Sequence, residues 1–210
     1  MKTLILASSG QFITQNNIDQ FLPKKIRDCS IAYITTASKK VNDDSYVKIH
    51  REQMDRLNFS YTEFDIAGKT EEVLRKALNG YDVVLVEGGN TFYLLKAVRE
   101  SGFDRVVKDL VENGVVYIGS SAGSYIACPS IIMATWSTHN FDRCGIVDFT
   151  GMNMVSFLLK AHYAPSMESM VRETKQNLEY PLKILNDSQA ILVQDQNIQF
   201  IGEGDEIMLL

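Results

Sequence analysis

The sequence has few cysteines and no long uninterrupted apolar run. Its three cysteines, Cys29, Cys128 and Cys144, are far apart and form no Cys-x-x-Cys pair, so neither a disulfide framework nor a zinc site is indicated. No segment approaches the roughly 18 consecutive apolar residues of a membrane span, and the apolar run at the N-terminus is too short for a signal peptide. We therefore expect a cytoplasmic protein that binds no membrane, no metal and no cofactor.

The composition is that of an ordinary soluble globular protein. Among 210 residues, 45% are hydrophobic and 22% are charged, and the net charge of −5 gives no electrostatic reason to expect nucleic acid as a partner. The chain contains no internal repeat, no low-complexity tract and no linker rich in proline or glycine. We expect one domain over residues 1–210, acting as a monomer or a homodimer.

Short β-branched and aromatic runs alternate with segments of helical spacing. This alternation predicts an α/β fold with a mostly parallel sheet covered by helices on both faces. Residues 190–194 and 198–201 flank a turn and predict an antiparallel hairpin at one edge of the sheet. The predicted strands are residues 3–8, 31–36, 61–66, 83–86 and 115–118, and the predicted helices are residues 43–57, 70–78, 92–99 and 106–112.

The chain is organised around the strand–turn–helix segment 115–127. Its centre is G-S-S-A-G, which matches the G-x-S-x-G nucleophile elbow. In such an elbow Ser121 lies on a turn that requires glycine on both sides, and the N–H of Ala122 faces the position of an oxyanion. Ser120 and Ser124 are rival hydroxyls, but only Ser121 occupies the centre. The alternative interpretation is a tight turn whose small residues serve packing alone.

A serine nucleophile needs a base, and the chain has three histidines. His50 lies in a predicted helix, and His139 lies in a polar loop. His162 follows an apolar run and precedes a loop, so it lies near the end of a strand. Because catalytic groups of open α/β sheets gather at the carboxyl ends of strands, His162 is favoured over His139. A structural histidine remains the alternative for each.

A second motif, Gly-Gly-Asn-Thr at residues 88–91, follows a buried strand and precedes a helix. Two glycines allow backbone N–H groups to approach a ligand, and Asn90 can cap the helix. A dinucleotide turn is weakly supported, since no G-x-G-x-x-G is present. We favour the second half of an oxyanion hole, in which the N–H of Gly89 faces that of Ala122, with Gly88 and Asn90 next to the substrate.

Three stretches together resemble peptidase family S51, which contains aspartyl dipeptidase (peptidase E) and the cyanophycinases. They are G-G-N-T-F-x-L-L at residues 88–95, Y-I-G-x-S-A-G-x-x-x-A-C-P at residues 117–129, and the pair His162-Tyr163. The resemblance covers nearly the whole chain. It implies a three-layer α/β fold similar to class I glutamine amidotransferase domains, and a serine peptidase that uses Ser121 as nucleophile and His162 as base.

The resemblance also implies where the acid of the triad lies. The dipeptidases carry a glutamate in a turn just before the C-terminal hairpin, and the matching turn here, residues 185–189, offers Asp187. Aspartate is shorter by one methylene, so a modest backbone shift is expected. The rival carboxylates are Asp142, Asp148 and Glu168.

At the positions expected to set the substrate preference, the sequence departs from the family pattern. The dipeptidases carry an acidic residue soon after Cys-Pro, whereas residues 130–136 here contain none. Arg172 is a candidate for binding an acidic substrate side chain, with a helix-surface arginine as the alternative. The leading prediction is a dipeptidase E-like hydrolase of small peptides. The alternatives are a related hydrolase or isopeptidase with another specificity, and a catalytically silent binding module. A glutamine amidotransferase is disfavoured, because serine stands where that chemistry uses cysteine.

Overall fold

The computed structural model describes residues 1–136, 142 and 144–209. The main sheet of the protein has the strand order β3-β2-β4-β5-β1-β8-β9. The first five strands in this order are parallel to one another. β8 pairs antiparallel with β1, and β9 pairs antiparallel with β8. The strands are β1 (Thr3–Ala7), β2 (Ser30–Ile34), β3 (Ser60–Phe64), β4 (Val83–Val86), β5 (Val116–Ser120), β8 (Gln189–Gln194) and β9 (Asn197–Gly202).

The central strands are apolar on both sides because both faces of the sheet are covered. Along β1, Leu4 and Leu6 enter one hydrophobic core while Ile5 and Ala7 enter the other, and all four side chains are fully buried. This alternation is the two-residue period of a strand applied to a sheet with two dry faces. It also explains why the sequence shows continuous apolar runs there instead of alternating polar and apolar residues.

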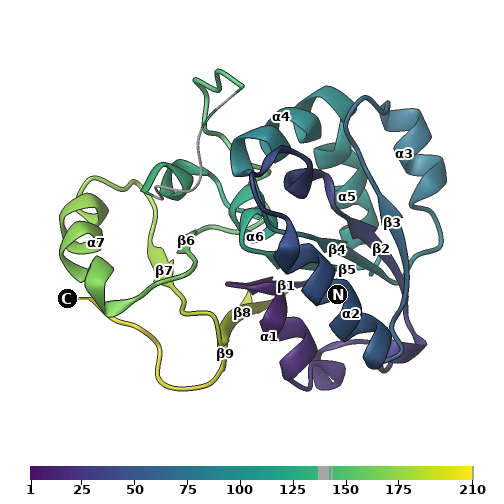
Figure 1. Cartoon of the computed structure of the whole chain (residues 1–210), viewed down its shortest axis with the longest axis horizontal. Helices are drawn as coiled ribbons and strands as arrows, with labels where there is room; N and C mark the ends of the chain where they lie inside the picture. The colour runs from purple at the N-terminus through teal and green to yellow at the C-terminus, as the bar shows by residue number, and fades with distance from the viewer. Residues whose placement is uncertain (137–141, 143, 210) are drawn as a thin grey trace.

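Helices cover the two faces unequally (Figure 1). One core includes side chains of α1 and α2, and the other includes those of α3, α4, α5 and α6. The helices are α1 (Gly10–Gln15), α2 (Ser45–Arg56), α3 (Glu71–Ala77), α4 (Thr91–Ser101), α5 (Phe103–Glu112), α6 (Ala122–Ala127) and α7 (Glu168–Lys175). The structure is therefore three-layered, with the sheet between two helical layers.

A smaller parallel sheet lies beside the main one, on the left of Figure 1. It pairs β6 (Leu158–Lys160) with β7 (Leu182–Ile184), and α7 connects these two strands. The hydrogen-bonded pairing continues past the strand ends, since the N–H of Tyr163 donates to the Leu185 carbonyl at 2.9 Å. The segments that follow β6 and β7 are thus held side by side.

The predicted fold class is confirmed, and most element boundaries differ by only a few residues. The predicted strand 83–86 coincides with β4, and the predicted hairpin is formed by β8 and β9. The helix predicted from residue 106 instead begins at Phe103, because Gly102 in the left-handed region (φ 72°) ends α4 and permits α5 to start at once. The sequence predicted neither α1 nor the three-residue strand β7, whereas β6 lies just before His162, where the end of a strand was expected.

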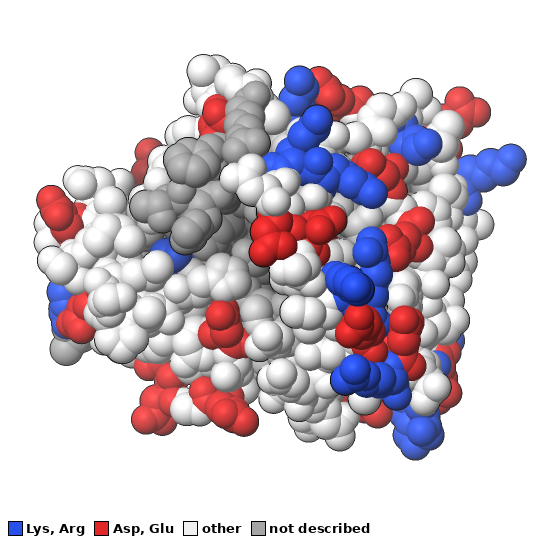
Figure 2. All heavy atoms as spheres, viewed as in Figure 1, with Lys and Arg blue, Asp and Glu red and all other residues white. Residues whose placement is uncertain are grey.

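The charged surface mixes both signs on the face shown in Figure 2. Lys and Arg side chains alternate there with Asp and Glu. Between α3 and α5, Glu71 pairs with Arg75 and Arg105 at 2.7 and 2.6 Å. Within the described ranges, no helix combines the length and the apolar character needed to cross a membrane.

Candidate active site

Ser121 occupies the turn between β5 and α6 and has a strained backbone. Its φ of 48° and ψ of −105° fall in a region that residues with side chains rarely adopt. A Cβ added at Gly119 would lie 2.7 Å from the carbonyl carbon of Gly123, and one added at Gly123 would lie 2.2 Å from the Val86 oxygen. Both glycines of the motif are therefore required by close backbone approach.

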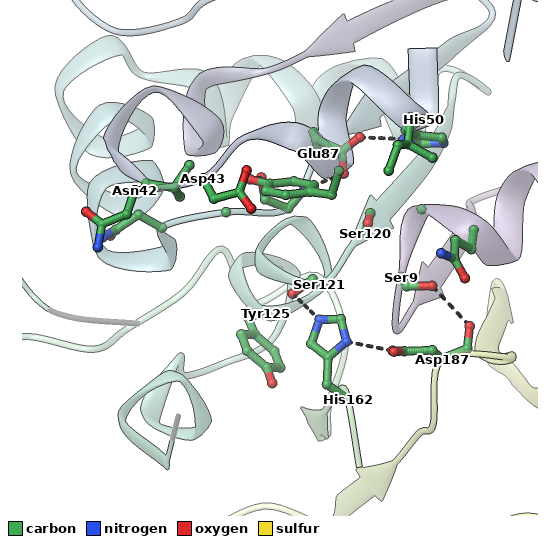
Figure 3. Close-up of a pocket in the computed structure, with 18 of the residues that line it drawn as sticks. Ser9, Asn42, Asp43, His50, Glu87, Ser120, Ser121, Tyr125, His162 and Asp187 are labelled. Carbon is green, nitrogen blue, oxygen red and sulfur yellow. Dashed lines mark hydrogen bonds and ion pairs between the residues drawn. The ribbon is translucent and has the colours of Figure 1, made fainter. Parts of the chain in front are cut away.

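The side chains of Ser121, His162 and Asp187 form a continuous hydrogen-bonded line (Figure 3). Ser121 Oγ lies 2.9 Å from His162 Nε2, and His162 Nδ1 lies 2.6 Å from Asp187 Oδ1. An ionised carboxylate only accepts, so Nδ1 of the neutral ring carries the proton and Nε2 accepts from the serine hydroxyl. The hydrogen bond from His162 lowers the pKa of the Asp187 carboxyl, against the opposing effect of burial.

The topology brings these three residues together from distant parts of the chain. β5 ends at Ser120, directly before the serine, and β1 separates β5 from β8, whose first residue lies two positions after Asp187. His162 and Asp187 follow the paired strands β6 and β7. All three residues therefore lie just beyond strand ends, where ligands bind in open α/β sheets.

The rival carboxylates are engaged elsewhere. Asp142 accepts two backbone N–H groups of its own loop, at 2.7 and 2.6 Å. Asp148 lies 3.1 Å from a guanidinium nitrogen of Arg99, and Glu168 lies 2.7 Å from one of Arg172. Among the described residues, the carboxylate that meets His162 Nδ1 is that of Asp187.

Of the two rival hydroxyls, Ser120 is the last residue of β5 and lines the cavity next to Ser121, whereas Ser124 has partners elsewhere. Ser124 is fully buried, and its Oγ lies 2.7 Å from the Ala7 carbonyl oxygen, which ties α6 to β1. His50 is buried against Glu87, at 2.5 Å. His139 lies outside the described residues.

The loop after β4 lies against the turn at Ser121. A Cβ added at Gly88 would be 3.2 Å from Ser121 Cβ. Gly89 has a φ of 136°, and a Cβ there would lie 2.5 Å from the Ala37 carbonyl oxygen, so only glycine fits. Asn90 caps α4, since its Oδ1 accepts from the Tyr93 N–H at 2.9 Å.

Hydrogen bonds fix the orientation of this loop. The N–H of Gly88 donates to the Glu87 carboxylate at 2.7 Å, and the Gly88 carbonyl accepts from the Tyr46 hydroxyl at 3.1 Å. In a planar trans peptide the C=O and the next N–H point in opposite directions, so the Tyr46 contact also directs the N–H of Gly89. Within the described part of the chain, neither this N–H nor that of Ala122 has a hydrogen-bond acceptor.

A buried polar cluster supports the same loop and was missed by the sequence analysis. Glu87 is almost completely buried, and its carboxylate accepts from the Tyr33 hydroxyl and pairs with His50 Nδ1 at 2.5 Å. Burial raises the pKa of Glu87, but the hydrogen bonds from His50, Tyr33 and the Gly88 N–H outweigh it, so the pKa is lowered. The only sequence signal was a glutamate between an apolar strand and a Gly-Gly pair.

A cavity of about 600 Å³ adjoins these groups. Its walls include Ser121, His162 and Asp187 (Figure 3). Gly88, Gly89 and Asn90 of the loop also line it. Lys40 and Asp43 add charges of opposite sign, and His50 and Glu87 are also at the wall. Arg172, a candidate for binding an acidic substrate side chain, is not among the described residues that line this cavity.

Lys160 is a further cavity residue that the sequence did not single out. Its side chain is almost completely buried, and its ammonium group donates to the Ala161 carbonyl at 2.6 Å. Burial lowers the pKa of this lysine, and the charge of Asp187 partly offsets the effect. As for metals, no group of three or more His, Cys, Asp or Glu side chains in the described ranges is arranged to hold an ion.

The fold and the site define a three-layer α/β protein with a serine on a strand-to-helix turn, in hydrogen-bonding contact with a histidine. A model of peptidase family S51 matches residues 4–201, so the chain belongs to this family. The predicted family is thereby confirmed, and with it a peptidase function at the level of the family.

Individual relatives are similar over most of the chain. An uncharacterized peptidase of Pasteurella multocida is 29% identical over 199 residues, which cover 93% of this chain and 95% of the relative. A peptidase E of a Nostoc species is 27% identical over 203 residues, covering 91% of this chain and 79% of the relative.

Two solved structures share the fold. A crystal structure of a candidate peptidase E from Listeria monocytogenes has a TM-score of 0.84 at 24% identity, covering 97% of this chain and 100% of that one. A peptidase from an acI-B1 actinobacterium has a TM-score of 0.73 at 14% identity, covering 100% of this chain and 91% of that one. At these identities the two structures support the fold alone.

Proposed function

We propose that this chain is a serine-type peptidase that cleaves short peptides through a covalent intermediate at Ser121. The observation that carries the proposal is the hydrogen-bonded line from Ser121 through His162 to Asp187, with contacts of 2.9 and 2.6 Å. The line ends at a serine on a strained turn, at the wall of a cavity. A nucleophile, a base and a group that orients the base are the parts that acyl transfer requires.

Acylation follows from these three side chains. His162 Nε2 takes the hydroxyl proton as Ser121 Oγ attacks the scissile carbonyl carbon, and the carbonyl π electrons move to its oxygen. The tetrahedral intermediate collapses, the C–N bond breaks, and the leaving amine receives the proton from His162. Asp187 stays ionised, holds the proton of the ring on Nδ1 and stabilises the imidazolium that forms.

The oxyanion is held by two backbone N–H groups, those of Gly89 and Ala122. Both lack an acceptor within the described part of the chain, and Gly88 next to one of them approaches Ser121 closely. Donors fixed in advance stabilise the developing charge without reorganising, and removal of one such donor typically costs about 10²–10³ in rate.

Deacylation reverses the roles with water as nucleophile. His162 removes a proton from the water, which attacks the acyl carbon, and the same proton then protonates Ser121 Oγ as the acid product leaves. The cavity of about 600 Å³ has the size of a small-molecule site, which suits a short peptide as substrate. The peptidase E name of a relative supports the same class of substrate. Gly88 and Asn90 contact the substrate backbone in this proposal, and Arg172 receives no role.

The test combines labelling with turnover. Purified protein is treated with a fluorophosphonate, the modified residue is identified by mass spectrometry, and a library of free and N-blocked dipeptides is screened for cleavage. Ser121→Ala should lose labelling and cleavage and keep its fold, because triad removal typically costs about 10⁴ or more in kcat.

Other outcomes separate the alternatives. Labelling of Ser121 without cleavage of any peptide would indicate a hydrolase for another acyl compound. Absence of labelling in the folded wild-type protein would indicate a silent binding module and would contradict the proposal. Ser101→Ala serves as a control, because Ser101 is a buried serine of α4 outside the site.

A further inference from the structure

Ser8 is a buried residue directly after β1 that contacts two members of the hydrogen-bonded line at once. Its Oγ lies 3.0 Å from Asp187 Oδ1, and the backbone N–H of His162 donates to the same Oγ at 2.8 Å. Ser8 is 0% exposed and is not among the described residues that line the cavity. It therefore reaches the base and the acid from behind and does not face a substrate.

The single proton of this hydroxyl has one good acceptor. Because Oγ already accepts the N–H of His162, its own proton is free to donate either to Asp187 Oδ1 at 3.0 Å or to the Leu185 carbonyl at 3.5 Å. The shorter contact to a charged acceptor is the stronger one. Asp187 Oδ1 thus accepts from Ser8 and from His162 Nδ1 together, and both bonds fix the same oxygen.

The strand order explains why a residue after β1 can do this. β1 lies between β5, which carries the turn of Ser121, and β8, which follows Asp187. The Ala7 carbonyl accepts the N–H of Ser121 at 3.1 Å, and the N–H of Ser8 donates to the Gln189 carbonyl at 3.1 Å. The end of β1 is therefore hydrogen-bonded to the segments that bear the nucleophile and the acid.

The base and the acid need such support because neither is held by burial. The side chains of His162 and Asp187 are 46% and 56% exposed. His162 also has a positive φ of 55°, which a residue with a side chain adopts only when its surroundings hold it there. The buried Ser8 hydroxyl is hydrogen-bonded to both the His162 backbone and the Asp187 carboxylate, and so holds the two in a fixed relative position.

We propose that Ser8 is a positioning residue that holds the Asp187 carboxylate and the backbone of His162 in register, and so sets the reactivity of Ser121. The inference rests on the proposed function, since it concerns how the same three residues are aligned. Ser8 acts through its neighbours, and its loss should slow the chemical step without weakening the binding of a reactant.

The test uses the rate at which a fluorophosphonate modifies Ser121, which needs no knowledge of the natural substrate. Ser8→Ala should lower the maximal rate of labelling by about 10- to 100-fold, the range expected for losing hydrogen bonds to a charged partner, and leave the half-saturating probe concentration unchanged. Ser8→Thr, which keeps the hydroxyl, should remain within about fivefold of wild type.

Ser101→Ala is the matched control. Ser101 is also a buried serine, with Oγ 3.4 Å from the Val98 carbonyl oxygen and accepting the Phe103 N–H at 3.3 Å. Its removal deletes a comparable donor and acceptor away from the site. Thermal unfolding of every variant shows that the compared proteins are folded.

A spectroscopic readout separates alignment from general damage. The proton that His162 Nδ1 shares with Asp187 should give a low-field NMR signal in wild type, assigned by its loss in Asp187→Asn, and Ser8→Ala should weaken or shift it while Ser101→Ala should not. Ser8→Ala labelled within about threefold of wild type, with that signal unchanged, overturns the inference. If Ser8→Thr does not fold, the signal and rate of Ser8→Ala decide. Failure of wild type to label at Ser121 would instead contradict the proposed function itself.

Discussion

Replacing Asp187 with asparagine tests the assignment of the acid most directly. The substitution keeps the size and shape of the side chain and removes its charge. In the structure Asp187 Oδ1 accepts from His162 Nδ1 at 2.6 Å and from Ser8 Oγ at 3.0 Å, so both neighbours present donors to the same oxygen. An asparagine that turns its NH₂ group toward them meets two donors, and one that turns its oxygen toward them preserves both bonds without the charge.

The two orientations bracket the expected loss. If the amide NH₂ faces His162, the ring proton moves to Nε2, the serine loses its acceptor, and the rate falls by about 10⁴. If the amide oxygen faces His162, only the charge assistance is lost, about 1.5–3 kcal/mol, or about 10- to 100-fold. We therefore expect Asp187→Asn to reduce labelling of Ser121 by about 10²–10⁴.

The matched control for this substitution is Asp148→Asn. Asp148 is an exposed rival carboxylate paired with Arg99, so the labelling rate of this variant should coincide with that of wild type. Labelling of Asp187→Asn within a few-fold of wild type would refute the assignment.

Three further predictions concern the loop after β4 and the cluster beneath it. Tyr46→Phe removes the hydrogen bond to the Gly88 carbonyl and should lower the maximal labelling rate by about 2- to 10-fold at an unchanged melting temperature; no change in rate would show that the loop is held without it. Gly89→Ala should lose at least about 10²-fold in labelling rate, since φ 136° and the close backbone contact exclude a Cβ; near-normal labelling would remove that N–H from the oxyanion site. His50→Ala leaves the buried Glu87 carboxylate without its imidazole partner and should cost about 3–5 kcal/mol in urea unfolding at neutral pH. The lowered pKa of Glu87 stabilises wild type above the ordinary value of 4.5, and this contribution is lost as the pH falls. The difference in the free energy of unfolding between variant and wild type should therefore narrow below that pH, and a constant difference would contradict the contact between His50 and the Glu87 carboxylate.

The sequence predicted the parts of the fold that local pattern determines. A short apolar run between turns predicts a buried strand such as β4. The turn at Ser121 is predicted by two glycines that no other residue can replace. Both signals are local, because they depend on what a few consecutive residues pack against. For the same reason the hairpin of β8 and β9 was predictable from two short apolar runs on either side of the turn at Asp195.

The pairing of β6 with β7 was not predictable, although it matters most for the site. Each strand has three residues, which is too few for a periodic pattern, and α7 separates the two strands in the sequence. Only the tertiary pairing places His162 next to the turn of Asp187. Placement near a strand end favoured His162, and the resemblance to a known family supplied Asp187. The distance of 2.6 Å between His162 Nδ1 and Asp187 Oδ1 is a property of the assembled sheet.

The supporting residues were invisible for a related physical reason. Ser8 looks like any small polar residue at the end of a strand, and Glu87 looks like any acid at the start of a loop. Their significance lies in partners far away in sequence, since Ser8 bonds to Asp187 across 179 positions and Glu87 pairs with His50 across 37. A buried polar group costs free energy unless every donor and acceptor is matched, and that matching is decided by the fold as a whole. Groups that touch reacting atoms are restricted to a few residue types and can be proposed from a motif. Groups that align them need only a hydroxyl or a carboxylate at the right point in space, so they become visible only once the strands are in place.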